Sequence, residues 1–166
     1  MSHVHSKGTK PEVIVRKYLW NHGFRYRMNH PRLPGKPDIV LRKYRSCVFI
    51  NGCFWHGHGV SVVDGNISTT EGKCFRRPHT NSDFWNKKIV RNKQRDADVQ
   101  RQLAKMGWHC ITIWECELNE RNRDATLASL VYTLNKIYLQ DHSSRKYEIP
   151  ENDELQMVAE ERSFEH

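Results

Sequence analysis

Short apolar runs and longer stretches of helical spacing interleave along the chain, and their order constrains the fold more than any other feature. The apolar runs have the length and the content of β-branched and aromatic residues that strands favour. We expect strands at residues 38–41, 47–50 and 108–114. Apolar residues three and four positions apart predict helices at residues 9–22, 82–106 and 124–139. The order helix, two strands, helix, strand, helix predicts an α/β sandwich around a mixed sheet.

Turn and cap signals set the ends of these elements. Residues 9–12, Thr-Lys-Pro-Glu, are typical of a capping box, in which the threonine and glutamate side chains both accept hydrogen bonds from backbone amides. Ser82 would begin the second helix and Gly107 would end it. Residues 59–73 are rich in Gly, Ser and Thr without helical periodicity, so we expect a loop there. The apolar positions that we expect to face the core from the helices are Ile14, Val15, Tyr18, Leu19, Trp85, Ile89, Leu103, Met106, Leu127, Leu130, Val131, Leu134, Ile137 and Tyr138.

Charge divides the 166-residue chain into two parts. Residues 141–166 hold eight acids against three bases, a net charge of −5. Because the whole chain carries +8, residues 1–140 carry +13. A body this basic favours a polyanionic partner, most simply nucleic acid, although a basic face can also be only a well-solvated surface. We therefore predict one basic domain over residues 1–140, followed by an acidic, weakly patterned tail over residues 141–166.

No apolar run approaches the roughly 18–20 residues that a membrane span needs, and no apolar segment of a signal peptide follows Met1. We expect a cytoplasmic protein, whose thiols stay reduced. The five cysteines are an odd number, which also argues against a full disulfide framework. Metal binding or simple burial are the uses that remain for them.

The densest cluster of reactive side chains lies at residues 51–58, Asn-Gly-Cys-Phe-Trp-His-Gly-His, directly after the second expected strand. Each residue has an ordinary interpretation: a buried cysteine, core aromatics, surface histidines. Glycines on both sides leave little regular structure in which to bury them, and this favours a functional loop.

Metal binding is the first function that this loop suggests. Cys53 and His58 are five positions apart, close enough for both to reach one ion. With Cys74 and Cys116 they would form a tetrahedral set typical of structural zinc. The set lacks a pair of close-set cysteines, so burial of the thiols stays an alternative. The remaining two cysteines lie inside expected strands, where they would pack as small apolar groups.

Acid–base chemistry and stacking are the other two functions. Asp38 opens an expected strand and could hold Mg²⁺ against a phosphate, although an aspartate after proline is also common in turns. His56 is the nearest base that works at neutral pH. The rings of Phe54, Trp55 and Trp85 could enter a base step of DNA and unstack it.

Taken in order, the motifs of this chain match a known family. They are residues 34–38 (PGKPD), 48–56 (VFINGCFWH), 83–85 (DFW), 95–96 (RD, after Asn92), 107–108 (GW) and 114–116 (WEC). The chain resembles the very-short-patch-repair (Vsr) mismatch endonucleases from Thr9 to about Leu139. The runs at 52–56 and 114–116 are highly specific.

The resemblance implies a restriction-endonuclease-like three-layer sandwich within the PD-(D/E)xK superfamily, with a structural zinc site. It implies a Mg²⁺-dependent DNA endonuclease that nicks one strand 5′ of the thymine in a T·G mispair and so initiates very-short-patch repair of deaminated 5-methylcytosine. The implied partner is double-stranded DNA with a T·G mispair, and contact with mismatch-repair proteins stays open. We expect a monomer in the bacterial cytoplasm, acting at the nucleoid.

The resemblance also implies roles for individual residues. Asp38 would be the Mg²⁺ carboxylate, and the backbone carbonyl of Ile50 would be a second metal contact. His56 would be the catalytic base, and Glu12 an accessory acid near metal-bound waters. The implied zinc ligands are Cys53, His58, Cys74 and Cys116, and the implied intercalating side chains are Phe54, Trp55 and Trp85.

Three positions depart from common patterns. Asn51 stands where the best-known family members carry a catalytic histidine; an amide can hold water or phosphate but cannot carry charge. Residues 59–73 separate His58 from the next cysteine, where the family often has a near-adjacent one, so His79 could replace Cys74 as a ligand. The usual glutamate and lysine of PD-(D/E)xK enzymes are absent at the end of the second strand, and the Vsr family shares this absence.

Two other functions compete with mismatch nicking. One is a related nuclease with another DNA target, such as a restriction or junction-cleaving enzyme. The other is a zinc-containing DNA-binding protein without catalysis, which the uncharged Asn51 would suit. A nicking assay with Mg²⁺ on matched and mispaired duplexes separates the three.

Overall fold

The computed structural model describes residues 8–70 and 74–143. Its helices are α1 (Lys10–Asn21), α2 (Ser82–Lys105) and α3 (Arg123–Ser143), with short 3-10 turns η1 (Arg42–Tyr44) and η2 (Glu115–Leu118). Its strands are β1 (Arg27–Met28), β2 (Ile39–Leu41), β3 (Ser46–Asn51), β4 (Val60–Val63), β5 (Asn66–Thr70) and β6 (His109–Trp114).

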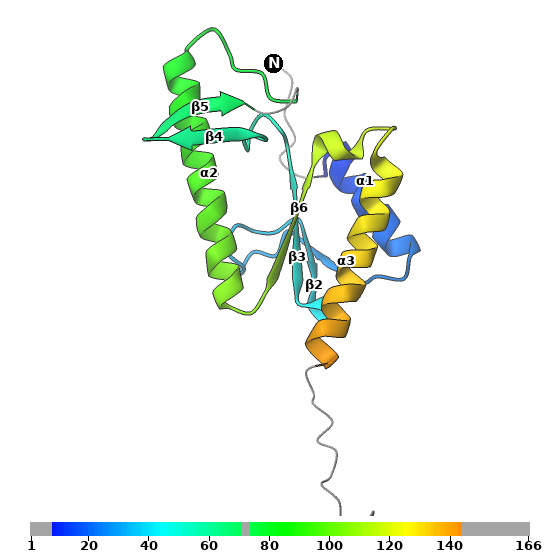
Figure 1. Ribbon diagram of the computed structural model, residues 1–166. Helices are drawn as coiled ribbons and strands as arrows, with labels where there is room; N and C mark the ends of the chain where they lie inside the picture. Colours follow the sequence, from blue (N-terminus) through cyan, green and yellow to red (C-terminus); the bar gives the residue numbers. More distant parts are fainter. Residues whose placement is uncertain (1–7, 71–73, 144–166) are drawn as a thin grey trace, which may run out of the picture.

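The central sheet is mixed, as predicted. Its strand order is β1-β2-β3-β6, in which β2 is antiparallel to both β1 and β3, and β6 is parallel to β3. The parallel pair is joined by a crossover that contains the β4–β5 hairpin and α2. α2 covers one face of the sheet, and α1 and α3 cover the other (Figure 1). The three layers are those of the α/β sandwich that the order of elements predicts.

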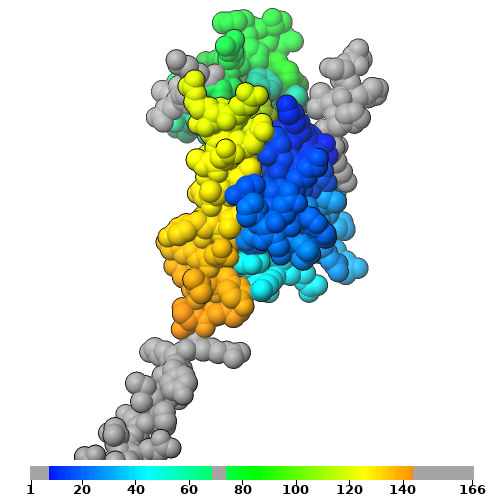
Figure 2. All heavy atoms as spheres, turned by 90° about the vertical axis from the view of Figure 1, so that its right-hand side faces the viewer, coloured from blue at the N-terminus to red at the C-terminus, as the bar shows by residue number. Residues whose placement is uncertain are grey.

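Alternation along β2 explains how both faces of the sheet are buried. Ile39 and Leu41 point into the core beneath α1 and α3, whereas Val40 points toward α2. The larger core gathers Val15, Leu19, Ile39, Leu41, Val48, Leu127, Leu130 and Leu134. Burial of each such aliphatic side chain contributes about 1.5–3 kcal/mol relative to leaving it exposed. Figure 2 shows the outer face of this layer, where α1 and α3 lie side by side.

The three predicted helices are present, with differences at their ends. Thr9 precedes α1, but its side chain makes no capping hydrogen bond. The carboxylate of Glu12 instead accepts a hydrogen bond from the backbone amide of Gly8, at 2.8 Å. Met106, predicted to be buried, is 49% exposed because α2 ends one residue before it. α3 continues to Ser143 and so includes the first three residues of the predicted acidic tail, whose remainder lies outside the described residues.

The prediction of a loop over residues 59–73 is wrong for residues 60–70, and residues 71–73 lie outside the described residues. β4 and β5 form an antiparallel hairpin, and its turn is Asp64-Gly65. Both turn residues have positive φ, 51° and 76°, the backbone geometry that two-residue hairpins favour. Val60 and Ile67 bury the inner side of the hairpin against Ile89 and Val90 of α2 (Figure 1). An Asp-Gly pair between β-branched residues is a recognised hairpin signal. The loop was predicted from the absence of helical periodicity, which does not distinguish a loop from a hairpin.

Among the described parts of the chain, no helix has both the length and the apolar character needed to cross a lipid bilayer.

Candidate active site and metal centre

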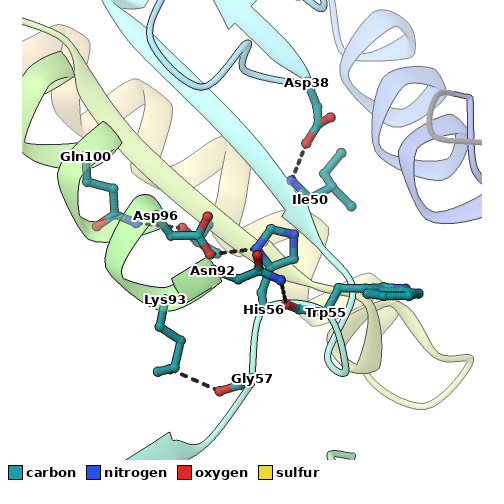
Figure 3. Close-up of polar contacts among 10 residues, drawn as sticks. Asp38, Ile50, Trp55, His56, Gly57, Asn92, Lys93, Asp96 and Gln100 are labelled. Atoms are coloured by element: carbon teal, nitrogen blue, oxygen red, sulfur yellow. Dashed lines mark hydrogen bonds and ion pairs between the residues drawn. The ribbon is translucent and has the colours of Figure 1, made fainter. Parts of the chain in front are cut away.

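Asp38 lies where β2 begins and β3 ends. The antiparallel register pairs Ile39 with Val48, so the chain just before β2 lies beside the last residues of β3. The backbone amide of Ile50 donates a hydrogen bond to Oδ2 of Asp38, at 2.7 Å (Figure 3). This contact fixes the carboxylate beside the backbone of Ile50, whose carbonyl the family resemblance predicts to share one Mg²⁺ site with Asp38.

The environment of Asp38 disfavours its negative charge. Burial raises the pKa of Asp38 from 3.8 to about 6, against the lowering effect of the Ile50 amide. The nearby carboxylate of Glu12 raises this pKa further, and His56 lowers it. A bound cation would stabilise the ionised form of this carboxylate and so offset the cost of its burial.

Asp38 opens into a cavity of about 500 Å³ between α1, the sheet and α2. Glu12 reaches it from α1 and Asn51 from the end of β3, and both are buried. The other polar residues that line it are Lys36, His56, Arg95, Asp96, Gln100 and Thr112. The cavity therefore collects all four residues predicted for catalysis: Glu12, Asp38, Asn51 and His56.

His56 is paired with Asp96, a contact that the sequence did not predict. Nδ1 of His56 lies 2.6 Å from Oδ2 of Asp96 on α2 (Figure 3). With a proton on Nδ1 held by the carboxylate, Nε2 is left to accept a proton from a substrate or water. Asp96 belongs to the Arg-Asp motif of the family resemblance, which was its only signal in the sequence.

The loop at residues 51–58 is held against α2 by two further side chains. Nδ2 of Asn92 donates to the carbonyl of Trp55 at 2.8 Å, and Nζ of Lys93 donates to the carbonyl of Gly57 at 3.0 Å (Figure 3). Burial lowers the pKa of Lys93, an effect that nearby Asp96 opposes. Gly57 has φ of 60°, and a Cβ there would lie 2.8 Å from Cγ2 of Ile89, so the loop approaches the helix as closely as only glycine allows.

Cys53, His58, Cys74 and Cys116 come together in one cluster, with their ligand atoms all within 4.8 Å of one another. Nδ1 of His58 lies 3.7, 3.2 and 3.4 Å from the sulfurs of Cys53, Cys74 and Cys116. The His58 ring is stacked on Trp114, with centroids 4.1 Å apart, which fixes its orientation. Three thiols and one imidazole are a donor set that could hold a metal ion.

The chemistry of the cluster fits a cation. Burial raises the pKa of Cys53 to about 12 and also raises that of Cys116. Thiolates packed this closely repel one another, and a divalent cation removes that repulsion when it displaces their protons. Cys74 rather than His79 joins the cluster, although the β4–β5 hairpin separates it from His58.

Aromatic rings gather on the outer side of the loop. Phe54 stacks on Phe75 and meets the edge of Trp85, and Trp55 lies 5.9 Å from Trp85 between ring centroids. Trp55 is 41% exposed and points away from the His56–Asp96 pair (Figure 3). Phe84, to which no role was assigned from sequence, is 58% exposed beside Trp85. Nζ of Lys88 lies 5.2, 5.3 and 5.8 Å from the centroids of Trp55, Trp85 and Phe84.

Comparison with known proteins gives one family. The family model described as DNA mismatch endonuclease Vsr matches residues 1–61. The type II nicking enzyme V.NmeAIP of Neisseria meningitidis is 50% identical over 121 residues, which cover 73% of this chain and 78% of that protein. The DNA mismatch endonuclease Vsr of Escherichia coli K12 is 32% identical over 123 residues, 74% of this chain and 71% of that protein. The type II nicking enzyme V.NaeI of Lentzea aerocolonigenes is 36% identical, with 78% and 71% covered.

Proposed function

The chain belongs to the Vsr family of DNA endonucleases, and from this membership we propose that it nicks one strand of a duplex 5′ of the thymine in a T·G mispair. The nick would initiate very-short-patch repair of deaminated 5-methylcytosine. One observation carries the proposal. The Asp38 carboxylate and the His56–Asp96 pair line the same cavity, so a metal-binding group and a proton acceptor face one volume.

Mg²⁺ would be held by the Asp38 carboxylate and the Ile50 carbonyl, with Glu12 accepting hydrogen bonds from its waters. These are oxygen donors, which Mg²⁺ prefers. When bound, the ion neutralises negative charge on the scissile phosphate. The unfavourable burial of Asp38, seen in its pKa of about 6, supports a cation as its partner.

Proton transfer would depend on His56. Asp96 holds Nδ1 of His56, which orients the ring and stabilises the imidazolium formed when Nε2 takes the proton of the attacking water. The buried amide of Asn51 is uncharged and would hold water or phosphate by hydrogen bonds, without transferring a proton.

Zinc would occupy the cluster of Cys53, His58, Cys74 and Cys116 as a closed, structural site. Its ligands come from the loop after β3, from the segment before α2 and from η2, so the ion would fasten these three segments together on a restriction-endonuclease-like scaffold. Residues 1–140 would form the nuclease domain.

Selectivity for a mispair would come from the aromatic rings. The ring centroids of Phe54, Trp55 and Trp85 lie within 6 Å of one another, and Trp55 is exposed on the loop at residues 51–58. Entry of a ring into a base step costs a few kcal/mol of unstacking, and this cost is lowest at a weakly stacked wobble pair. The basic residues of α2 and the net charge of +8 support double-stranded DNA as the partner, in the cytoplasm.

A nicking assay tests this function. The full chain with Mg²⁺ is incubated with duplexes that carry one T·G mispair in a panel of cytosine-methylation contexts, and with the matched duplexes. We expect one nick, 5′ of the mispaired thymine, and little cutting of matched DNA. Asp38→Ala should abolish the nick, whereas Asp98→Ala, at an exposed acid on α2, should not. Equal cutting of matched duplexes would show another DNA target, and tight binding without a nick would show a non-catalytic protein.

A further inference from the structure

We propose that the ammonium group of Lys36 contacts the scissile phosphate and stabilises the negative charge that develops there during cleavage. This inference rests on the proposed nuclease function. The end of β3, Ile50-Asn51-Gly52, has no charged side chain that could stabilise a phosphate. The proposal gives this role to Lys36, in the turn before β2.

The reaction needs such a cation. An oxygen of water forms a bond to phosphorus while the bond from phosphorus to the leaving deoxyribose oxygen breaks, and the leaving oxygen takes a proton from solvent. His56 takes the proton lost by the water, and Lys36 keeps its own protons and donates hydrogen bonds to a non-bridging oxygen. Donors aimed at developing charge stabilise it most when they are shielded from bulk water, and the side chain of Lys36, exposed in the free protein, would be covered by a bound duplex. Lys36 and Arg95 are the two basic side chains, besides His56, that line this cavity.

The backbone around Lys36 is held rigidly beside Asp38. The amide of Lys36 donates to the carbonyl of Leu33 at 3.1 Å, which closes a turn, and the following Pro37 is fully buried. Gly35 has φ of 71° and lies against α2, because a Cβ there would be 2.4 Å from Cγ1 of Val99. The turn is thus clamped between α2 and the sheet, two residues from the proposed Mg²⁺ ligand.

Lys36 itself has an unfavourable backbone conformation, with φ of 46°. Asparagine and aspartate adopt this left-handed region more easily than lysine does, and they occupy it at Asn29, Asp64 and Asn81. A lysine in the same region indicates that its side chain is needed there.

Arg45 is the other long cation in the left-handed region, and its side chain has structural contacts. Its guanidinium donates to the carbonyl of Met106 at 3.1 Å and lies over the ring of Trp108. For Lys36, the described ranges 8–70 and 74–143 contain no ion pair or ring contact of the ammonium group. Its charge is therefore free to meet a phosphate in the cavity.

Lys36→Asn separates this function from a structural role, because asparagine suits the left-handed backbone. Under single-turnover conditions on the mispaired duplex, we expect the nicking rate to fall roughly 100- to 1,000-fold, as for loss of one donor to developing charge. The melting temperature should stay level or rise. Lys36→Arg should recover most of the rate. Lys136→Asn is the matched control, because it removes the same charge from an exposed site on α3. It should nick within about threefold of wild type, since the effect of Lys36 comes from its position in the cavity and not from the net charge of the protein.

A binding cycle tests the contact without catalysis. Affinity is measured in Ca²⁺ for the normal duplex and for one whose scissile phosphate is a neutral methylphosphonate. Wild type should lose affinity on this replacement and Lys36→Asn should lose much less. Equal losses of affinity for wild type and Lys36→Asn would overturn the proposal. A nicking rate of Lys36→Asn within threefold of wild type would also overturn it. If Arg95→Met nicks slowly while Lys36→Asn nicks normally, the cationic role belongs to Arg95. If the wild-type chain nicks no duplex, the nuclease function fails, and the binding cycle, with the neutral linkage placed 5′ of the mispaired thymine, still tests the Lys36 contact.

Discussion

Asp38 is a half-buried carboxylate whose negative charge is unfavourable in the folded protein. Its pKa is raised to about 6 chiefly by burial, so the folded protein binds this proton more tightly than the unfolded chain does. Between pH 3.8 and about 6 the folded state carries more protons than the unfolded state, and the contribution of Asp38 to stability falls as the pH rises. Above pH 6 the full penalty of the buried charge is present.

Asp38→Asn should therefore stabilise the protein without added Mg²⁺, by about 1–2 kcal/mol above pH 6 once partial exposure to solvent is allowed for. Well below pH 3.8 the variant and wild type should be equally stable, because the aspartate is then neutral in both states. Urea unfolding at pH 4, 6 and 8 measures the difference. A gain that is the same at all three values of pH would show that charge burial is not its cause.

Asp96 is predicted to matter for rate and not for affinity. Asp96→Asn should lower the nicking rate roughly 10²- to 10⁴-fold, because the neutral amide no longer stabilises a protonated His56. Binding of the mispaired duplex should change little. Asp98→Asn is the matched control, since Asp98 lies two residues further along α2 in an exposed ion pair with Arg101. Single-turnover rates and binding titrations give the two readouts, and equal rates for both variants would remove Asp96 from the mechanism.

Some residues of the site can be predicted from their local sequence, and others cannot. Asp38 follows a proline at the start of an apolar run, and His56 lies between glycines, so local context marks both. Asp96 and Lys36 have no such local mark. The contact from Asp96 to His56 spans 40 positions and depends on how α2 lies across the sheet, and the left-handed backbone of Lys36 depends on packing of its turn against Val99.

Among the elements, those with a strong period were predicted and those defined by pairing were not. α1, α2, α3, β2, β3 and β6 follow from the spacing of their apolar residues. β1 has only two residues, both exposed, and exists because it pairs with β2. The β4–β5 hairpin has polar residues on its outer side, which hid its strands among loop residues.

Gly57 offers a test of how the loop at 51–58 is fitted to α2. Gly57→Ala adds both a strained positive φ and a clash with Ile89, and should destabilise the fold by about 2–4 kcal/mol. Gly65→Ala is the control, because its φ is 76° but nothing lies within 4 Å of a Cβ there. It should cost only about 1–2 kcal/mol. Urea unfolding compares the two, and equal losses would mean that the loop moves away from α2 without cost.

Over the whole molecule, the Cys₃His cluster joins segments that are far apart in the chain. Cys116 lies 63 positions after Cys53, yet both belong to one cluster that could hold a metal ion. The sequence predicted these four residues, and the structure brings them together in place of the alternative with His79. The three-layer arrangement was also predictable, because the order of helices and strands leaves few ways to cover both faces of a mixed sheet.

Cys116→Ser should release the metal and destabilise the protein by several kcal/mol, since the binding energy of a structural ion is folding energy. Cys110→Ser is the matched control: this thiol lies on β6 outside the cluster. Metal content by mass spectrometry and melting temperature are measured for both. One equivalent of zinc retained by Cys116→Ser would show that the cluster is not the binding site.

The proposed catalytic histidine lies between two members of the ligand set, since His56 stands between Cys53 and His58 on one short loop. On the assignments proposed above, an ion bound at the cluster would fix this loop on both sides of His56. Removal of the ion is therefore expected to slow nicking as well as to destabilise the fold, because the integrity of the cluster and the placement of the proposed base would depend on the same bound group.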